Sequence, residues 1–198
     1  MTYAIEARDL YYTYEDGTVA LDHISFRAER GKMTGILGAN GAGKSTLFLN
    51  LNGVLTPAGG EVRVDGVPVT YDRKGLISVR KQVGIVFQDP DDQLFSADVY
   101  RDISFGGVNL GLPEEEVRRR VDEAMEWTGV THLKGKPTHA LSFGQKKRVA
   151  IAGVLVMEPS VVILDEPTAG LDPQGVSDIM RLLAELRGRL GMTIIIAT

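Results

Sequence analysis

The sequence GANGAGKST, residues 38–46, decides the fold that we expect for this chain. Its glycine, four residues, glycine, lysine and serine follow the phosphate-binding loop pattern. The short apolar run KMTGILG leads into it, and LFLNLNGVL continues from it with helical spacing. Because this motif requires a strand before it and a helix after it, the context favours a nucleoside triphosphate site over a chance glycine-rich turn.

Each residue type in this loop has a physical role. Glycines let backbone N–H groups curl around an anion, the Lys44 ammonium can neutralise the β- and γ-phosphates, and the Ser45 hydroxyl can bind Mg²⁺. The loop therefore predicts a nucleoside triphosphate and Mg²⁺ as ligands, and a kinase, a GTPase or a motor would fit it equally. The candidate nucleotide-binding residues here are Gly38, Ala39, Asn40, Gly41, Ala42, Gly43, Lys44, Ser45 and Thr46.

Length and composition limit the class of protein. A chain of 198 residues suffices for one α/β core, and a net charge of −4 disfavours a nucleic-acid partner. The absence of cysteine excludes disulfides and thiolate metal sites. The first residues lack a signal-peptide pattern, and no run approaches the roughly 20 apolar residues that cross a bilayer. We expect a cytoplasmic protein.

Strand and helix patterns alternate along the chain. Residues 4–14 and 20–30 have the alternation of paired strands around the turn EDG, and 61–69 predict another strand pair. Helical spacing dominates from about 89 to 157. Apolar runs at 83–87, 161–164 and 192–198 predict buried parallel strands, with a helix from about 173 to 189 before the last of them. The plan is an α/β core interrupted by a mainly helical insertion.

The run VVILDE, residues 161–166, places two acids at the end of a buried strand. Asp165 is a candidate ligand of Mg²⁺, and Glu166 is a candidate general base for an attacking water. An ordinary buried strand that ends in solvated acids is an equally good interpretation of this run alone.

The run LSFGQKKR, residues 141–148, resembles the LSGGQ signature of the ATP-binding-cassette ATPases. A serine hydroxyl and glycine N–H groups at a helix start can bind an anion, and Ser142 with Gln145 is also a capping-box pattern. The resemblance implies that Ser142, Phe143, Gly144 and Gln145 cover the γ-phosphate bound by a second copy. Phe143 departs from the family by replacing a glycine, so we expect an altered rate.

The resemblance extends along the chain and implies further roles. Tyr14 matches the aromatic that stacks on the adenine of ATP, although taken alone it fits a core aromatic of a strand better. Asp172 ends the loop TAGLD, which communicates across the dimer in the family. The implied catalytic residues are Glu166, Gln88 and Lys44. The implied ligands of Mg²⁺ are Ser45, Gln88 and Asp165.

The resemblance also implies a fold and its boundaries. We expect a P-loop NTPase domain of the ABC ATPase type, with a RecA-like core at about 1–88 and 158–198. An antiparallel β subdomain would lie at the N-terminus, and a helical subdomain would be inserted at about 89–157. The family places a γ-phosphate histidine after the last strand, at position 199 here. We therefore expect the rest of the family domain to lie beyond Thr198.

The segment DPDDQLFSADVYRDISFG, residues 89–106, resembles energy-coupling-factor importers, especially those for cobalt or nickel. This implies an ATP-hydrolysing subunit, on the inner face of the membrane, that forms a homodimer or a heterodimer with a related ATPase and binds integral membrane subunits. Asp89, Asp91 and Asp92 are interpreted as a solvated turn rather than a metal site. The alternatives are a soluble ABC ATPase of DNA repair, translation or cluster assembly, and a switch without turnover.

Overall fold

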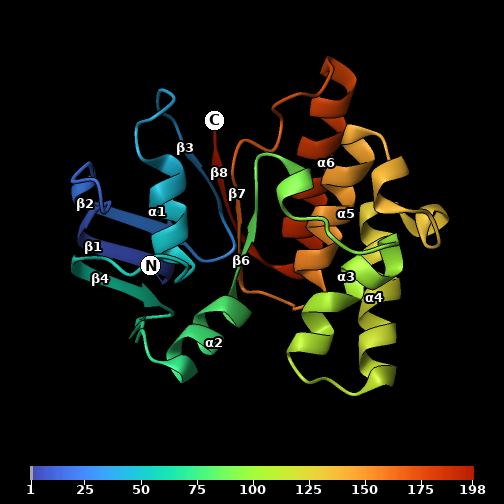
Figure 1. Ribbon diagram of the computed structural model, residues 1–198, viewed down its shortest axis with the longest axis horizontal. Helices are drawn as coiled ribbons and strands as arrows, with labels where there is room; N and C mark the ends of the chain where they lie inside the picture. Colours follow the sequence, from blue (N-terminus) through green and yellow to red (C-terminus); the bar gives the residue numbers. More distant parts are fainter. Residues whose placement is uncertain (1) are drawn as a thin grey trace.

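The N-terminal part of the chain forms an antiparallel sheet in a computed structural model that describes residues 2–198 (Figure 1). Its strand order is β2-β1-β4-β5. The strands are β1 (Tyr3–Thr13), β2 (Val19–Glu29), β4 (Gly59–Val64) and β5 (Val67–Pro68). The predicted strand pairs are therefore present. β1 is one of the two inner strands, and it pairs with both β2 and β4.

A second sheet is parallel, with the order β3-β8-β7-β6. Its strands are β3 (Met33–Ile36), β6 (Val83–Val86), β7 (Val161–Leu164) and β8 (Thr193–Ala197). Every residue of β7 and β8 is buried. Continuous apolar runs fit this position because both faces of the sheet are covered.

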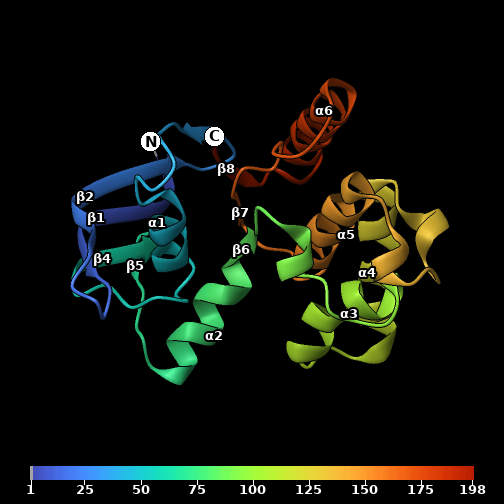
Figure 2. The same ribbon diagram turned by 45° about the horizontal axis from the view of Figure 1, so that its top comes forward.

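Helices lie on both sides of the parallel sheet. They are α1 (Lys44–Leu51), α2 (Arg73–Gln82), α3 (Val99–Asn109), α4 (Glu114–Thr128), α5 (Phe143–Leu155) and α6 (Pro173–Leu190), with 3-10 turns at Pro90–Asp92, Thr131–Leu133 and Thr138–Ala140. Figures 1 and 2 both show the antiparallel sheet with α1 on one side of the molecule and α3–α6 on the other. Among residues 2–198, no helix is long and apolar enough to span a bilayer.

The parallel sheet separates two hydrophobic cores. Ile163 and Ile195 face the core that includes α1 and the antiparallel sheet. Their neighbours Leu164 and Ile194 face the core beneath α3–α6. Successive strand residues point to opposite faces, so each buried strand contributes to both cores. Strands β7 and β8 therefore pack against apolar side chains on both faces.

Helix α2 was not expected from the sequence. Only Val79 is buried among its residues, so the apolar stripe that signals a helix is nearly absent. The Asp72 carboxylate accepts a hydrogen bond from the Gly75 N–H at 2.9 Å and caps the helix start. The Arg80 guanidinium donates to the Gly53 carbonyl at 2.9 Å, which ties α2 to the end of α1.

Candidate nucleotide-binding site

The phosphate-binding loop connects β3 to α1, as the sequence predicts. Gly41 and Gly43 have φ angles of 81° and 87°, which favour glycine. A Cβ on Gly43 would lie 2.5 Å from the Ala20 carbonyl oxygen of β2. Glycine at this position therefore allows the loop to curl over α1 while it packs against the antiparallel sheet.

A pocket of about 690 Å³ lies beside this loop. Its walls come from the loop, from the β1–β2 turn region, and from the ends of β6 and β7. The residues that line it are Tyr14, Thr18, Val19, Ala20, Ala39, Asn40, Gly41, Ala42, Gly43, Lys44, Ser45, Thr46, Gln88 and Glu166. The structure therefore brings together most of the predicted nucleotide site, and it adds residues 18–20, which carried no sequence signal.

Lys44 is the cation of the pocket. Its ammonium donates to the carbonyl of Gly38 and, at 3.4 Å, to that of Ala39. It also lies 3.6 Å from Glu166 Oε1. With 9% exposure, this lysine is poorly screened by water, so it can strongly attract a phosphate that enters the pocket.

Ser45, which lines the pocket, contacts Asp165, which lines a neighbouring cavity. The Ser45 hydroxyl donates to Asp165 Oδ2 at 2.5 Å. Asp165 directly follows β7 and is 8% exposed. Hydroxyl and carboxylate oxygens are the ligands that Mg²⁺ prefers, so this pair fits the predicted metal site. Within residues 2–198 there is no cluster of three or more acidic or histidine ligands, and Asp89, Asp91 and Asp92 form none.

Glu166 follows Asp165 in a rare backbone conformation. Its φ angle is 42°, which is unfavourable for a residue with a side chain. Its carbonyl accepts a hydrogen bond from the Ala169 N–H at 3.0 Å, which closes the turn after β7. This turn directs the Glu166 carboxylate into the pocket that also holds Lys44.

Tyr14 lies just beyond β1 and is 40% exposed, so it is not a core aromatic. Its hydroxyl is 2.8 Å from the Thr46 hydroxyl. The Tyr12 ring packs edge-on against it at 5.1 Å between centroids. The Tyr14 ring is thus held at the pocket rim with a face available for stacking on a base.

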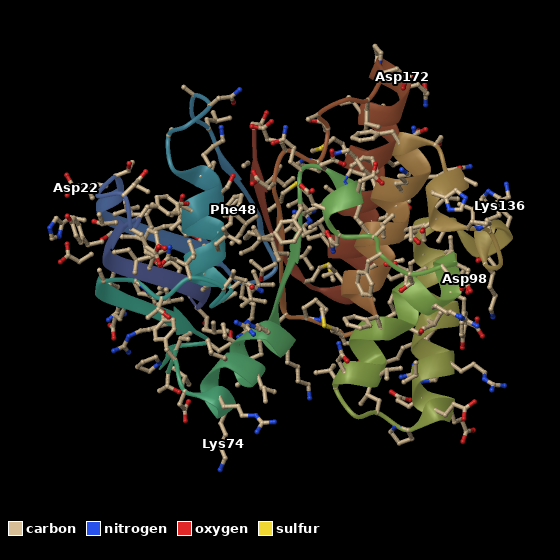
Figure 3. All side chains as sticks on the ribbon, in the orientation of Figure 1. Asp22, Phe48, Lys74, Asp98, Lys136 and Asp172 are labelled. Atoms are coloured by element: carbon tan, nitrogen blue, oxygen red, sulfur yellow. The ribbon has the colours of Figure 1, made fainter. Side chains whose placement is uncertain are left out.

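The signature residues lie apart from this pocket. The predicted capping box is present, since Ser142 accepts from the Gln145 N–H and the Gln145 side chain accepts from the Ser142 N–H at 3.0 Å. Asp172 caps α6 by accepting from the Gly175 N–H at 2.7 Å. Figure 3 shows Asp172 at the tip of α6, which packs on the opposite face of the parallel sheet from α1.

Phe143 of the signature and Lys147, one turn further along α5, lie near the residues that follow β6 and β7. Phe143 lines a second cavity of about 600 Å³ together with Gln88, Asp165 and Gly170. Lys147 was not singled out from the sequence, although it is only 2% exposed. Burial lowers the pKa of Lys147, while Asp89 and Glu166 act in the opposite direction.

Comparisons with known proteins agree with this geometry. The family model described as ABC transporter matches residues 21–169. The energy-coupling factor transporter ATP-binding protein EcfA2 of Clostridium perfringens is 63% identical over 196 residues, which cover 99% of this chain and 69% of that protein.

Solved structures show the same relationship. The structure of cbiO1 from Clostridium perfringens, described as part of the ABC transporter complex cbiONQ, matches with a TM-score of 0.91 and 62% identity over all of this chain and 79% of that one. The ATP-binding cassette MJ0796, dimeric and bound to ADP and Pi, matches with a TM-score of 0.86 and 27% identity over 98% of this chain and 87% of that one. The chain therefore belongs to the ABC transporter family of ATP-binding proteins.

Proposed function

We propose that this protein is the ATP-binding and ATP-hydrolysing subunit that energises an energy-coupling-factor type importer. The observation that carries the proposal is the convergence of Lys44, Ser45, Asp165, Glu166 and Gln88 around one phosphate loop. The names of the related EcfA and cbiO1 proteins support the importer class over soluble ABC ATPases of DNA repair, translation or cluster assembly. A switch without turnover does not account for the Glu166 carboxylate in the pocket.

The residues of the site have separate roles in the transfer of the γ-phosphoryl group to water. Loop N–H groups and the Lys44 ammonium bind the phosphates, and Tyr14 stacks on the adenine. Mg²⁺, held by Ser45, Asp165 and Gln88, would supply charge neutralisation between the phosphates. Glu166 orients the attacking water and accepts its proton. This assignment gives both charged side chains that line the pocket, Lys44 and Glu166, a role in catalysis.

Two copies of the ATPase complete each site in the proposed assembly. The signature residues and the start of α6 lie outside the pocket of their own chain, at exposed helix starts. These residues are Ser142, Phe143, Gly144, Gln145 and Asp172. A second copy, or a related ATPase, would place its own α5 start over the γ-phosphate. The ordered N–H groups at that helix start suit an anion.

A groove between α2 and α3 is the proposed contact with the membrane subunits. It has a volume of about 480 Å³, and its apolar walls include Ile77, Phe95, Phe105, Leu110 and Met157. Phe95, Phe105 and Ile77 are 65%, 47% and 55% exposed, which is unusual for side chains of this size. An apolar helix face of a membrane subunit fits a groove of this kind.

The proposal includes a location and domain boundaries. We place the protein on the inner face of the cell membrane, with residues 89–157 as the inserted helical subdomain that carries one wall of the groove. Cobalt or nickel remains the predicted cargo, on the basis of residues 89–106. Uptake of radiolabelled cobalt by cells that express the whole transporter, with nickel and biotin as competitors, tests the cargo directly.

The variant Glu166→Gln tests the proposed catalysis. ATP hydrolysis should fall by about 100-fold or more, because a positioned general base contributes factors of this size. ATP should still bind, because the phosphate loop is unchanged. Phosphate release and nucleotide affinity are measured on the same preparation. The variant Glu185→Gln, an exposed acid of α6, serves as the control and should keep normal turnover.

The outcome that contradicts the catalytic assignment is a Glu166→Gln variant with turnover equal to the wild type. Recovery of the protein with ribosomes or DNA-repair proteins, rather than with a membrane complex in detergent, would contradict the importer assignment.

A further inference from the structure

Lys147 is a buried cation that the proposed mechanism leaves unused. It lies on α5, one turn after the start of the helix, and is 2% exposed. Its polar contacts in the described part of the chain are with backbone carbonyls rather than with a carboxylate. Burying an ammonium costs free energy unless other groups accept its hydrogen bonds. The groups that accept the Lys147 hydrogen bonds therefore suggest why a lysine occupies this position.

The Lys147 ammonium joins the ends of two parallel strands. It donates to the Gln88 carbonyl at 3.0 Å and to the Glu166 carbonyl at 3.4 Å. The Phe143 ring covers a further side of the ammonium, with its centroid at 5.1 Å. The two carbonyls and the electron-rich ring face together satisfy the charge without an ion pair.

The two carbonyls belong to residues whose side chains line the nucleotide pocket. Gln88 follows β6, and Glu166 follows β7. Glu166 also has the strained φ angle of 42°, and a strained conformation persists only where surrounding contacts hold it. The Lys147 bond to the Glu166 carbonyl is one such contact, and the Ala169 N–H provides the other.

We propose that Lys147 is a positioning residue for ATP hydrolysis. Its ammonium holds the backbone of Gln88 and the backbone of Glu166 in a fixed position relative to each other. The inference rests on the proposed function, and it assigns this side chain a role in turnover rather than in nucleotide binding. Because Lys147 lies on the helix that starts with the signature, a shift of α5 also moves both pocket residues.

Lys146 provides a matched comparison on the same helix. Its ammonium forms an ion pair with Asp91 Oδ1 at 2.6 Å, so it too contacts the segment after β6. The Asp91 side chain is 60% exposed, and an ion pair of this kind contributes little. Loss of Lys146 should therefore leave the strand ends in place, whereas loss of Lys147 should release them.

The test compares Lys147→Met, Lys147→Gln and Lys146→Met with the wild type, in the full chain assembled with its membrane subunits. In Lys147→Met, kcat should fall about 10-fold or more, while Kd for MgATP stays within about threefold. Lys147→Gln retains amide donors and should recover part of the loss. Lys146→Met should keep wild-type kcat. Thermal unfolding measured in parallel identifies any variant that fails to fold, and Lys147→Gln then decides the question alone.

Two outcomes would overturn the inference. In one, both Lys147 variants keep kcat within twofold of the wild type. In the other, kcat and MgATP affinity fall by the same factor, which indicates a general loss of structure. A wild-type assembly that binds MgATP without hydrolysing it would instead contradict the proposed function, and the inference with it.

Discussion

Phe143 and Gly170, beside the pocket, pack together in a way that the LSGGQ signature does not predict. Phe143 stands where the family has glycine, and its ring packs between Lys147 and Gly170. Gly170 has a φ angle of 75°, and a Cβ there would lie 2.8 Å from the ring. The ring therefore occupies space that only glycine at position 170 leaves open.

The variant Phe143→Gly tests the contribution of this ring to turnover. Removing the ring exposes the Lys147 ammonium to water, so kcat should fall about fivefold, equivalent to the ~1 kcal/mol of a cation–π contact. Binding of MgATP should persist, because the phosphate loop is unaffected. Steady-state hydrolysis and nucleotide titration measure the two quantities. A variant that cannot bind ATP would contradict this placement of Phe143.

The variant Gly170→Ala tests the packing of the ring against the backbone. Alanine at a left-handed position costs about 1 kcal/mol, and displacement of the ring adds roughly 1–3 kcal/mol to the loss of unfolding free energy. Gly17→Ala is the matched control, because Gly17 has a φ of 85° with no atom within 4 Å of the added Cβ. Urea denaturation of both variants measures the difference, and equal losses would show that the ring moves freely.

Individual elements depend on local sequence to very different degrees. The capping box at Ser142 and the apolar stripe of α4 were predictable because their signals lie within one or two turns of helix. The start of α2 depends on a single cap at Asp72 and on the contact between Arg80 and α1. A contact of that kind has no local signature, which is why this helix was missed.

Helix α4 should carry a measurable acid sensitivity. Hydrogen bonds from Arg119 and Arg120 lower the pKa of Glu116 to about 2. Because the folded pKa lies below its ordinary value of 4.5, the stabilisation is complete above pH 4.5 and is lost as the pH falls towards 2. Glu116→Gln should therefore reduce the melting temperature at pH 6 and change it less at pH 3.

The control for this measurement is Glu115→Gln, one residue earlier in the same turn of α4. Glu115 forms no ion pair with the residues from 2 to 198, so its neutralisation should leave the melting temperature nearly unchanged at both pH values. Equal effects of the two variants at pH 6 would show that the Glu116 pairs with Arg119 and Arg120 are not stabilising.

At the scale of the whole molecule, the parallel sheet links the nucleotide pocket to the apolar groove. Residues after β6 contribute to both, since Gln88 lines the pocket and Gln93 lines the groove. The Gln93 side chain donates to the Ile85 carbonyl at 3.3 Å and accepts from the Phe87 N–H at 3.1 Å. A short segment after β6 therefore connects the nucleotide pocket to the proposed docking groove.

The variant Phe105→Asp tests the groove as a docking surface. The Phe105 ring packs edge-on against Phe95 at 4.7 Å, and both line the groove. A charge there should weaken co-purification with the membrane subunits about 10-fold or more, as for a buried aromatic at an interface, and leave ATP binding within twofold. The control Val67→Asp alters an exposed apolar residue of β5, and an equal effect of both variants would contradict the groove assignment.

The sequence by itself determined the phosphate loop, the order of strands and helices apart from α2, and the candidate residues of the site. These follow from local spacing, because a loop motif, an apolar strand and a helix cap each act within a few residues of chain. Only the tertiary structure decided that Lys147 joins Gln88 to Glu166 and that Phe143 packs on Gly170. Contacts between segments distant in the chain depend on how the two cores pack around the sheet, and no local pattern encodes them.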